Sequence, residues 1–171
     1  SWSSIVSKTD LGGRITEVND TFLEISGFSA DELIGKPHNL IRHPDVPPQV
    51  FAHMWDTLRK NRPWRGVVKN RCKDGDHYWV DAYVVPLRSG GRTVGYMSAR
   101  MEPSAQQIEA AQAQYKAVAA GAPAGGRFRA ASLLSVRNGV LAGVLFVIAA
   151  TLFGAFVGLR GIEAGRHADR H

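Results

Sequence analysis

The stretches PHNLIRHPD at 37–45 and PWRGVVKNR at 63–71 say most about the fold of this 171-residue chain. The first is dense in prolines and hydrogen-bonding side chains, and the second reads as a strand opened by Trp64. Side chains alternate across a strand, so Gly66 and Asn70 share a face with Trp64, while the basic residues share the other. The basic face should meet solvent. We therefore expect the Trp64 face to line the interior, and we predict there a pocket for a planar ligand with polar edges.

Short apolar runs and turns surround these two stretches and predict an α+β domain. Asn19 is a candidate N-cap for a helix that ends before Gly27, and Ser29 with Glu32 fits a capping box for a second helix. A longer helix should begin at the proline pair 47–48. We expect strands near 5–8, 14–18, 64–72, 77–87 and 93–102. This order predicts a five-stranded antiparallel sheet with short helices packed on one face.

The second half of the chain predicts three further segments after a first domain at 1–102. Residues 103–121 read as a connecting helix, and the glycine- and proline-rich sequence that follows indicates a linker over 122–137. Residues 138–159 are 22 residues without a formal charge, which as a helix would span about 33 Å. We predict a transmembrane helix there and a short tail at 160–171. The alternative is a buried core helix.

Composition excludes several classes of function. The formal charge is +6, from 21 Lys and Arg against 15 Asp and Glu, but the basic residues are scattered and no nucleic-acid-binding motif is present. Cys72 is the single cysteine, so an internal disulfide and a multi-thiolate metal site are excluded. We find no nucleophile with a base, no phosphate loop and no metal cluster, and predict that the chain is not an enzyme. Because it begins at Ser1, we expect a piece of a longer or processed protein.

Further short motifs accompany the two opening stretches: TD at 9–10, NDTF at 19–22, GKPHN at 35–39 and GDHYWV at 75–80. Together they resemble the PAS sensor domains of bacterial aerotaxis receptors, over about 8–121. The resemblance implies a PAS fold that binds FAD, senses redox or energy state, and passes it to a chemotaxis output. It implies a PAS domain on the cytoplasmic side of the cell inner membrane. Expected partners are a second copy, respiratory electron donors and chemotaxis signalling proteins, the last reached through parts not present in this chain.

The resemblance also implies which residues bind the cofactor. The expected positions are Asn19, His38, Arg42, His43, Asp45, Trp55, Trp64 and Asn70. For each residue of the segment around Arg42, direct contact and indirect shaping of the pocket wall both stay open. Asn70 could instead bond backbone groups, and the tryptophans could simply fill the core, with Trp79 the weakest ligand candidate.

Two other readings of such a domain remain. A haem-binding gas sensor would take His38, His43 or His53 as its axial ligand. A cofactor-free module would serve dimerisation alone. Cys72 is one candidate for a flavin–thiol photoadduct, but blue-light relatives carry their reactive cysteine where this chain has 38–45 and no cysteine. The resemblance therefore argues against a photoreceptor.

Overall fold

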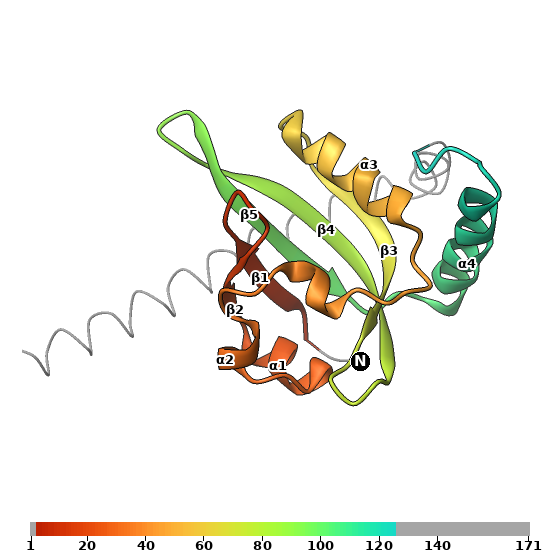
Figure 1. Cartoon of the computed structure of the whole chain (residues 1–171), viewed down its shortest axis with the longest axis horizontal. Helices are drawn as coiled ribbons and strands as arrows, with labels where there is room; N and C mark the ends of the chain where they lie inside the picture. The colour runs from red at the N-terminus through yellow and green to blue at the C-terminus, as the bar shows by residue number, and fades with distance from the viewer. Residues whose placement is uncertain (1–2, 126–171) are drawn as a thin grey trace, which may run out of the picture. The chain divides into compact units, whose positions relative to one another are not determined.

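The computed structural model describes residues 3–125 of the chain (Figure 1). In this part of the chain, strands at both ends of the domain flank a group of helices, and a further helix follows the last strand. Its elements are β1 (Ile5–Thr9), β2 (Ile15–Val18), α1 (Asp20–Ser26), α2 (Ala30–Leu33), the 3₁₀ helix η1 (His38–Ile41), α3 (Pro48–Arg59), β3 (Trp64–Arg71), β4 (His77–Ser89), β5 (Arg92–Met101) and α4 (Ala105–Ala119). Within residues 3–125 the predicted strands and helices are present, and the ends of the predicted ranges differ from the observed ones by at most two residues; η1 is an additional element.

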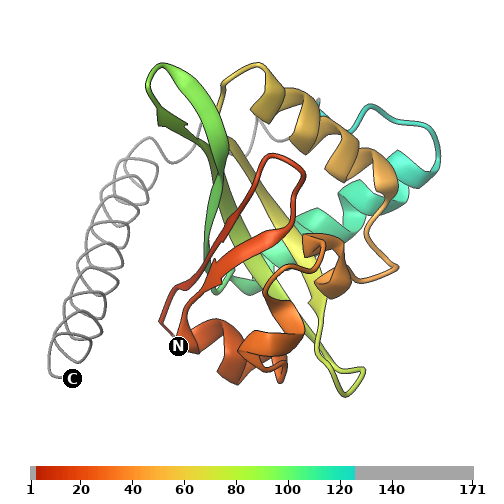
Figure 2. The same cartoon turned by 60° about the vertical axis from the view of Figure 1, so that its left-hand side comes forward.

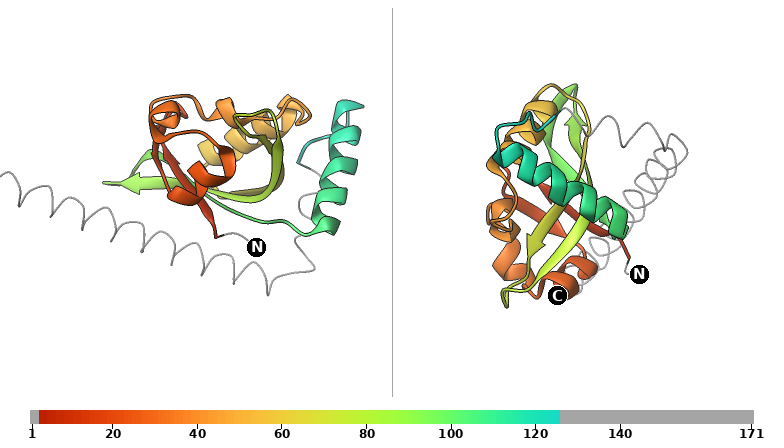
Figure 3. Two further views of the ribbon diagram at one scale, coloured as in Figure 1. Left: turned by 90° about the horizontal axis from the view of Figure 1, so that it is seen from below. Right: turned by 90° about the vertical axis from the view of Figure 1, so that its right-hand side faces the viewer.

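The strands form one antiparallel sheet in the order β2-β1-β5-β4-β3. The chain between β2 and β3 lies over one face of this sheet, which we call the inner face (Figures 1 and 3). In β3 burial alternates residue by residue, with Trp64, Gly66, Val68 and Asn70 buried. The inner position expected for Asn70 is therefore confirmed, and with it the predicted five-stranded fold.

Local signals in the sequence explain where the helices begin and end. The side chain of Asn19 caps α1 by accepting from the backbone N–H of Phe22, and Gly27 ends the helix with a φ of 74°. Ser29 and Glu32 form the expected capping box at α2. Ser104 forms another with Gln107 at the start of α4.

Both edges of the sheet are covered. At the β2 edge, the backbone of Ile15 exchanges hydrogen bonds with the 35–36 segment, at 2.7 and 2.9 Å. At the β3 edge, Arg42 forms a β-bridge with Asn70, and Tyr115 of α4 donates its hydroxyl to the carbonyl of Val67 at 2.7 Å. Backbone groups that are bonded in this way are not available for pairing with another chain.

The core lies between the inner face and the helices. It includes Phe22, Leu33 and Val50 from the helices and Ile5 and Val80 from the strands, none of which is exposed. Helix α3 lies over β3 and β4 (Figures 1 and 2), whereas α4 lies beside β3 (Figure 3). The gap between α3 and the sheet is where the predicted pocket should lie.

Within residues 3–125 no helix is long and apolar enough to cross a membrane. The predicted transmembrane helix at 138–159 lies outside the described residues, as do the tail at 160–171 and most of the linker at 122–137.

Candidate functional site

A cavity of about 440 Å³ lies between the inner face of the sheet and the segment formed by η1 and α3. Cavities of this size hold small organic molecules or cofactors in many proteins. Its apolar wall includes Phe51, Trp55 and Leu58 of α3 and Trp64 of β3. Polar groups from the sheet enter at the other side. The lining therefore combines flat apolar surfaces with a few polar positions, as predicted for a planar, polar-edged ligand.

Arg100 of β5 is the most unusual residue of the cavity. It is 2% exposed, and among the described residues its side chain has no carboxylate partner. It donates to Ser7, to Ser98 at 3.0 Å and to Nε2 of His38 at 2.9 Å, and its guanidinium lies 4.8 Å from the ring centre of Phe22. Its Nη1 is buried without a hydrogen-bond partner.

Burial lowers the pKa of Arg100 to about 10, so the side chain remains a cation at neutral pH. A buried charge without a counter-charge is costly, because water no longer solvates it. The orphaned Nη1, in a residue that lines the cavity, is a donor suited to a carbonyl oxygen or an anionic group of a ligand.

His38 lies beside Arg100 in its neutral form. Burial and the charge of Arg100 lower its pKa to about 3. A guanidinium can only donate, so Nε2 of His38 must be the acceptor and Nδ1 must carry the proton. His38 thus lines the cavity, as predicted, and holds Arg100 in place.

Asn70 and Arg42 line the cavity near the β3 edge. Asn70 is 5% exposed, and its amide offers both a donor and an acceptor. The guanidinium of Arg42 lies 4.3 Å from the ring centre of Phe51 and donates to the carbonyl of Val46 at 3.4 Å. These two contacts hold the Arg42 side chain in the wall of the cavity.

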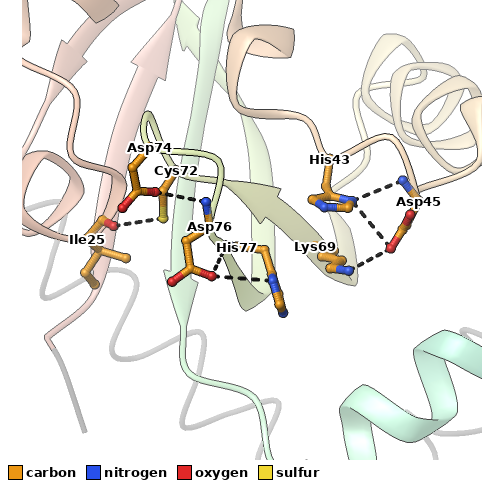
Figure 4. Close-up of polar contacts among 8 residues, drawn as sticks. All are labelled: Ile25, His43, Asp45, Lys69, Cys72, Asp74, Asp76 and His77. Atoms are coloured by element: carbon orange, nitrogen blue, oxygen red, sulfur yellow. Dashed lines mark hydrogen bonds and ion pairs between the residues drawn. The ribbon is translucent and has the colours of Figure 1, made fainter.

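His43 and Asp45 do not line the cavity. Instead they form polar contacts with each other and with Lys69 (Figure 4). Lys69 forms a 2.6 Å ion pair with Asp45, and Nδ1 of His43 accepts from the backbone N–H of Asp45 at 3.1 Å. The ring of His43 also meets that of His77 edge to face, 6.0 Å between centres. These contacts fasten the loop after Arg42 onto β3, which favours indirect shaping of the pocket over direct contact for both residues.

Asn19 also lies away from the cavity. Its Oδ1 accepts from the backbone of Val6 at 3.0 Å and of Phe22 at 3.2 Å, and its Nδ2 donates to the carbonyl of Ser4 at 2.8 Å. It therefore ties β1 to α1, so any effect of Asn19 on a ligand in this arrangement would pass through these elements.

The tryptophans separate into two groups. Trp55 and Trp64 line the cavity; Trp55 meets Tyr96 edge to face, 5.2 Å between centres, and Trp64 is 3% exposed. Trp79 does not line it, and stacks instead on Tyr115 of α4. Trp79 therefore contributes to the packing of α4 against the sheet and does not contact the cavity.

The rival chemistries find little support in this geometry. Of the histidines within 3–125, His38 alone lines the cavity, and its Nε2 is already bonded. Cys72 lies outside the cavity, where its thiol donates to the carbonyl of Ile25 at 3.3 Å and burial raises its pKa (Figure 4). The described residues contain no cluster of three metal-ligating side chains.

Sequence reasoning missed Arg100, Ser98 and Tyr96, which alternate along β5 and all line the cavity. An arginine in a strand is normally assigned to the solvent face, and that assumption hid it. The two-residue period of a strand puts Tyr96, Ser98 and Arg100 on one face, but does not say which face is the inner one. The structure decides that: Arg100 pairs with Ala82, which lies on the same face as Val80 and Val84.

Comparison with known proteins identifies the fold. A family model described as the PAS fold matches residues 15–100. The chain belongs to the PAS family. It is 50% identical over 119 residues to the aerotaxis receptor of Escherichia coli (strain K12), a match covering 70% of this chain and 24% of the receptor. It is 33% identical over 85 residues to the nitrogen fixation regulatory protein of Klebsiella pneumoniae, covering 50% of this chain and 17% of that protein.

Solved structures agree on the PAS fold at lower identity. The PAS domain of a protein from Colwellia psychrerythraea has a TM-score of 0.54 at 23% identity, covering 58% of this chain and 86% of that one. A light–oxygen–voltage domain studied with a flavin analogue has a TM-score of 0.56 at 22% identity, covering 63% and 81%. The chain spans a quarter or less of the two full-length relatives, which are by name a receptor and a regulator.

Proposed function

We propose that this PAS domain binds FAD and reports the redox state of the flavin as part of a membrane-anchored receptor for aerotaxis. The single observation that carries the proposal is the cavity in which Arg100 keeps a buried, partly unsatisfied cation beside neutral His38. The 50% identity to the aerotaxis receptor of Escherichia coli supports the same assignment.

The lining suits a flavin in three respects. Trp55, Trp64 and Leu58 supply flat apolar surface for a fused ring system. Asn70 can both donate to and accept from the polar ring edge. Arg100 can donate to an oxygen or a ring nitrogen that carries negative charge. Arg42 is the candidate for the diphosphate, since a guanidinium is a permanent and bidentate donor.

The bound flavin would supply electron transfer, and the protein's part is to respond to the change of charge. A flavin that gained electrons without taking up an equal number of protons would carry a more negative ring, and Arg100 would interact more strongly with that state than with the oxidised one. A sensor needs such a difference, because a ligand shifts a protein only when its states bind differently. His38, held neutral beside Arg100, adds no second charge to the site.

The sequence and the relatives support the same proposal for the rest of the receptor. Residues 138–159 would anchor the chain in the inner membrane, with the PAS domain in the cytoplasm. The chain spans 24% of the aerotaxis receptor, so the signalling parts that reach the chemotaxis proteins would lie outside it. Two copies would associate, and respiratory electron donors would set the redox state of the flavin.

The test is the visible absorption of the full chain, purified in detergent, followed by mass spectrometry of any released cofactor. We expect the paired absorption bands of an oxidised flavin and the mass of FAD. A sharp Soret band would assign haem instead, and a colourless protein that also fails to take up added FAD would indicate a cofactor-free module. Bleaching by a reductant and recovery in air would support redox sensing.

A further inference from the structure

His53 of α3 contacts the wall of the cavity. The indole Nε1 of Trp64 donates a hydrogen bond to Nδ1 of His53 at 3.2 Å. Trp64 is 3% exposed and lines the cavity, whereas His53 is half-buried and does not line it. Since Nδ1 is the acceptor, neutral His53 carries its proton on Nε2. The hydrogen bond fixes the rotation of the Trp64 indole and therefore the shape of that part of the wall.

The other nitrogen of the same ring faces the end of the described chain. A Cβ added to Gly125 would lie 2.8 Å from Nε2 of His53 and 3.0 Å from its Cδ2. Real Cβ atoms do not come that close, so this contact exists because residue 125 is glycine. One imidazole ring thus touches the cavity wall through Nδ1 and lies against Gly125 with its Nε2 edge.

Residues 121–125 are themselves tied to α4. Gln114 donates to the carbonyl of Ala124 at 3.1 Å, and the backbone N–H of Ala122 donates to the carbonyl of Ala117 at 2.9 Å. Helix α4 in turn is fastened to β3 by Tyr115. A displacement of the His53 ring therefore acts on the segment through which the chain continues toward 138–159.

We propose that His53 is a positioning residue that couples the shape of the cavity to residues 121–125. A ligand that shifts Trp64 moves the His53 ring against Gly125, and a change at Gly125 moves Trp64 in return. Reciprocity of this kind is required of any coupling between two sites. The coupling rests on contacts within the protein alone; only its response to FAD rests on the function proposed above.

The test uses the full chain in detergent, labelled with ¹⁵N-tryptophan, and follows the indole N–H resonance of Trp64. Trp64→Phe assigns that resonance by removing it. We expect Gly125→Ala to shift the Trp64 resonance, because the new methyl group must displace the His53 ring, and His53→Ala to shift it through loss of the acceptor. His53→Gln keeps an acceptor and should restore most of the wild-type shift. Ala122→Ser, at an exposed position three residues before Gly125, is the matched control.

The double variant His53→Ala with Gly125→Ala decides between coupling through His53 and a direct structural effect. Through His53, the Gly125 substitution has no further effect once the ring is gone. A Trp64 resonance unmoved by Gly125→Ala, or moved equally with and without His53, would overturn the proposal.

A second arm measures FAD binding by titration of the same variants. We expect Gly125→Ala to weaken binding about 5-fold or more, the lower end of typical coupling between sites, and to have no effect in the His53→Ala background. If no variant and not even the wild type binds FAD, the proposed function fails. The resonance experiment still decides the role of His53 in that case.

Discussion

Arg100 holds a full positive charge inside the domain, next to a histidine whose pKa is depressed to about 3. Neither property could be read from the sequence. The inner face of β3, which carries Trp64 and Asn70, could be predicted because burial alternates regularly along this strand. The role of Arg100 depends instead on the order of strands in the sheet, which places β5 in the middle of the inner face.

Arg100→Met should separate ligand binding from stability. Without ligand, the variant should be as stable as the wild type or more stable, because an unpaired buried charge is replaced by an apolar chain of similar length. FAD should bind about 10-fold to 100-fold more weakly, as expected for loss of 1.5–3 kcal/mol of charged hydrogen bonding. Flavin titration and chemical unfolding of the unloaded protein measure the two effects.

Arg100→Lys is the control that keeps the charge and loses the fork of donors. The reduction potential of flavin bound to Arg100→Lys should lie closer to the wild-type value than that of flavin bound to Arg100→Met. Equal FAD affinity and equal potential in all three proteins would remove Arg100 from the site.

His38 predicts a pH dependence of stability. Its pKa lies at about 3 in the folded protein and near 6.5 when unfolded, so acid protonates the unfolded chain first. Stability from this residue is complete above pH 6.5 and falls as pH drops toward 3, by about 1.4 kcal/mol per pH unit. His38→Gln should flatten this part of the curve. Urea unfolding at several pH values tests it, and equal slopes for both proteins would contradict the prediction.

At the scale of elements, most of the fold followed from local signals: the caps at Asn19, Ser29 and Ser104 and the alternation in β3. The structure of residues 37–45 could be predicted less well from the sequence. Its prolines and polar residues suggested a ligand-binding loop, but half of the segment forms η1 and the remainder is bound to β3 through Asp45 and Lys69. That division depends on tertiary contacts, which no local pattern reports.

Gly95 tests how closely β1 and β5 pack. A Cβ at this position would lie 2.3 Å from the backbone carbonyl oxygen of Thr9, which cannot move as a side chain would. Gly95→Ala should therefore destabilise the domain by about 1–3 kcal/mol or more. Gly12→Ala is the matched control, since its nearest neighbour would lie at 3.4 Å. Thermal unfolding of both variants measures the difference, and similar losses of stability would argue against this contact.

At the scale of the whole molecule, the PAS domain should fold and bind its ligand without the apolar segment 138–159. A chain ending at Gly121 should be soluble without detergent and still bind FAD, although with the altered affinity expected from loss of 122–125. The full chain should need detergent, because 22 uncharged residues have no partner surface in a domain whose core is already filled.

Val147→Arg should impair membrane insertion by about 2.5–3.5 kcal/mol, the cost of an arginine near the centre of a membrane helix. Fractionation of cells that express the full chain measures insertion, and the flavin spectrum should stay unchanged. A full chain that remains soluble, or a variant that loses its flavin, would contradict the separation of sensor and anchor.

The unpaired charge of Arg100 has a consequence for the life of the protein in a cell. A domain that carries this cost when empty is closer to unfolding than the same domain when loaded, since a ligand stabilises only the folded state. Proteases remove chains in proportion to the time they spend unfolded. We therefore expect newly made chains to survive according to the supply of ligand. With FAD as the proposed ligand, cells short of flavin would contain less of this protein and very little of it empty.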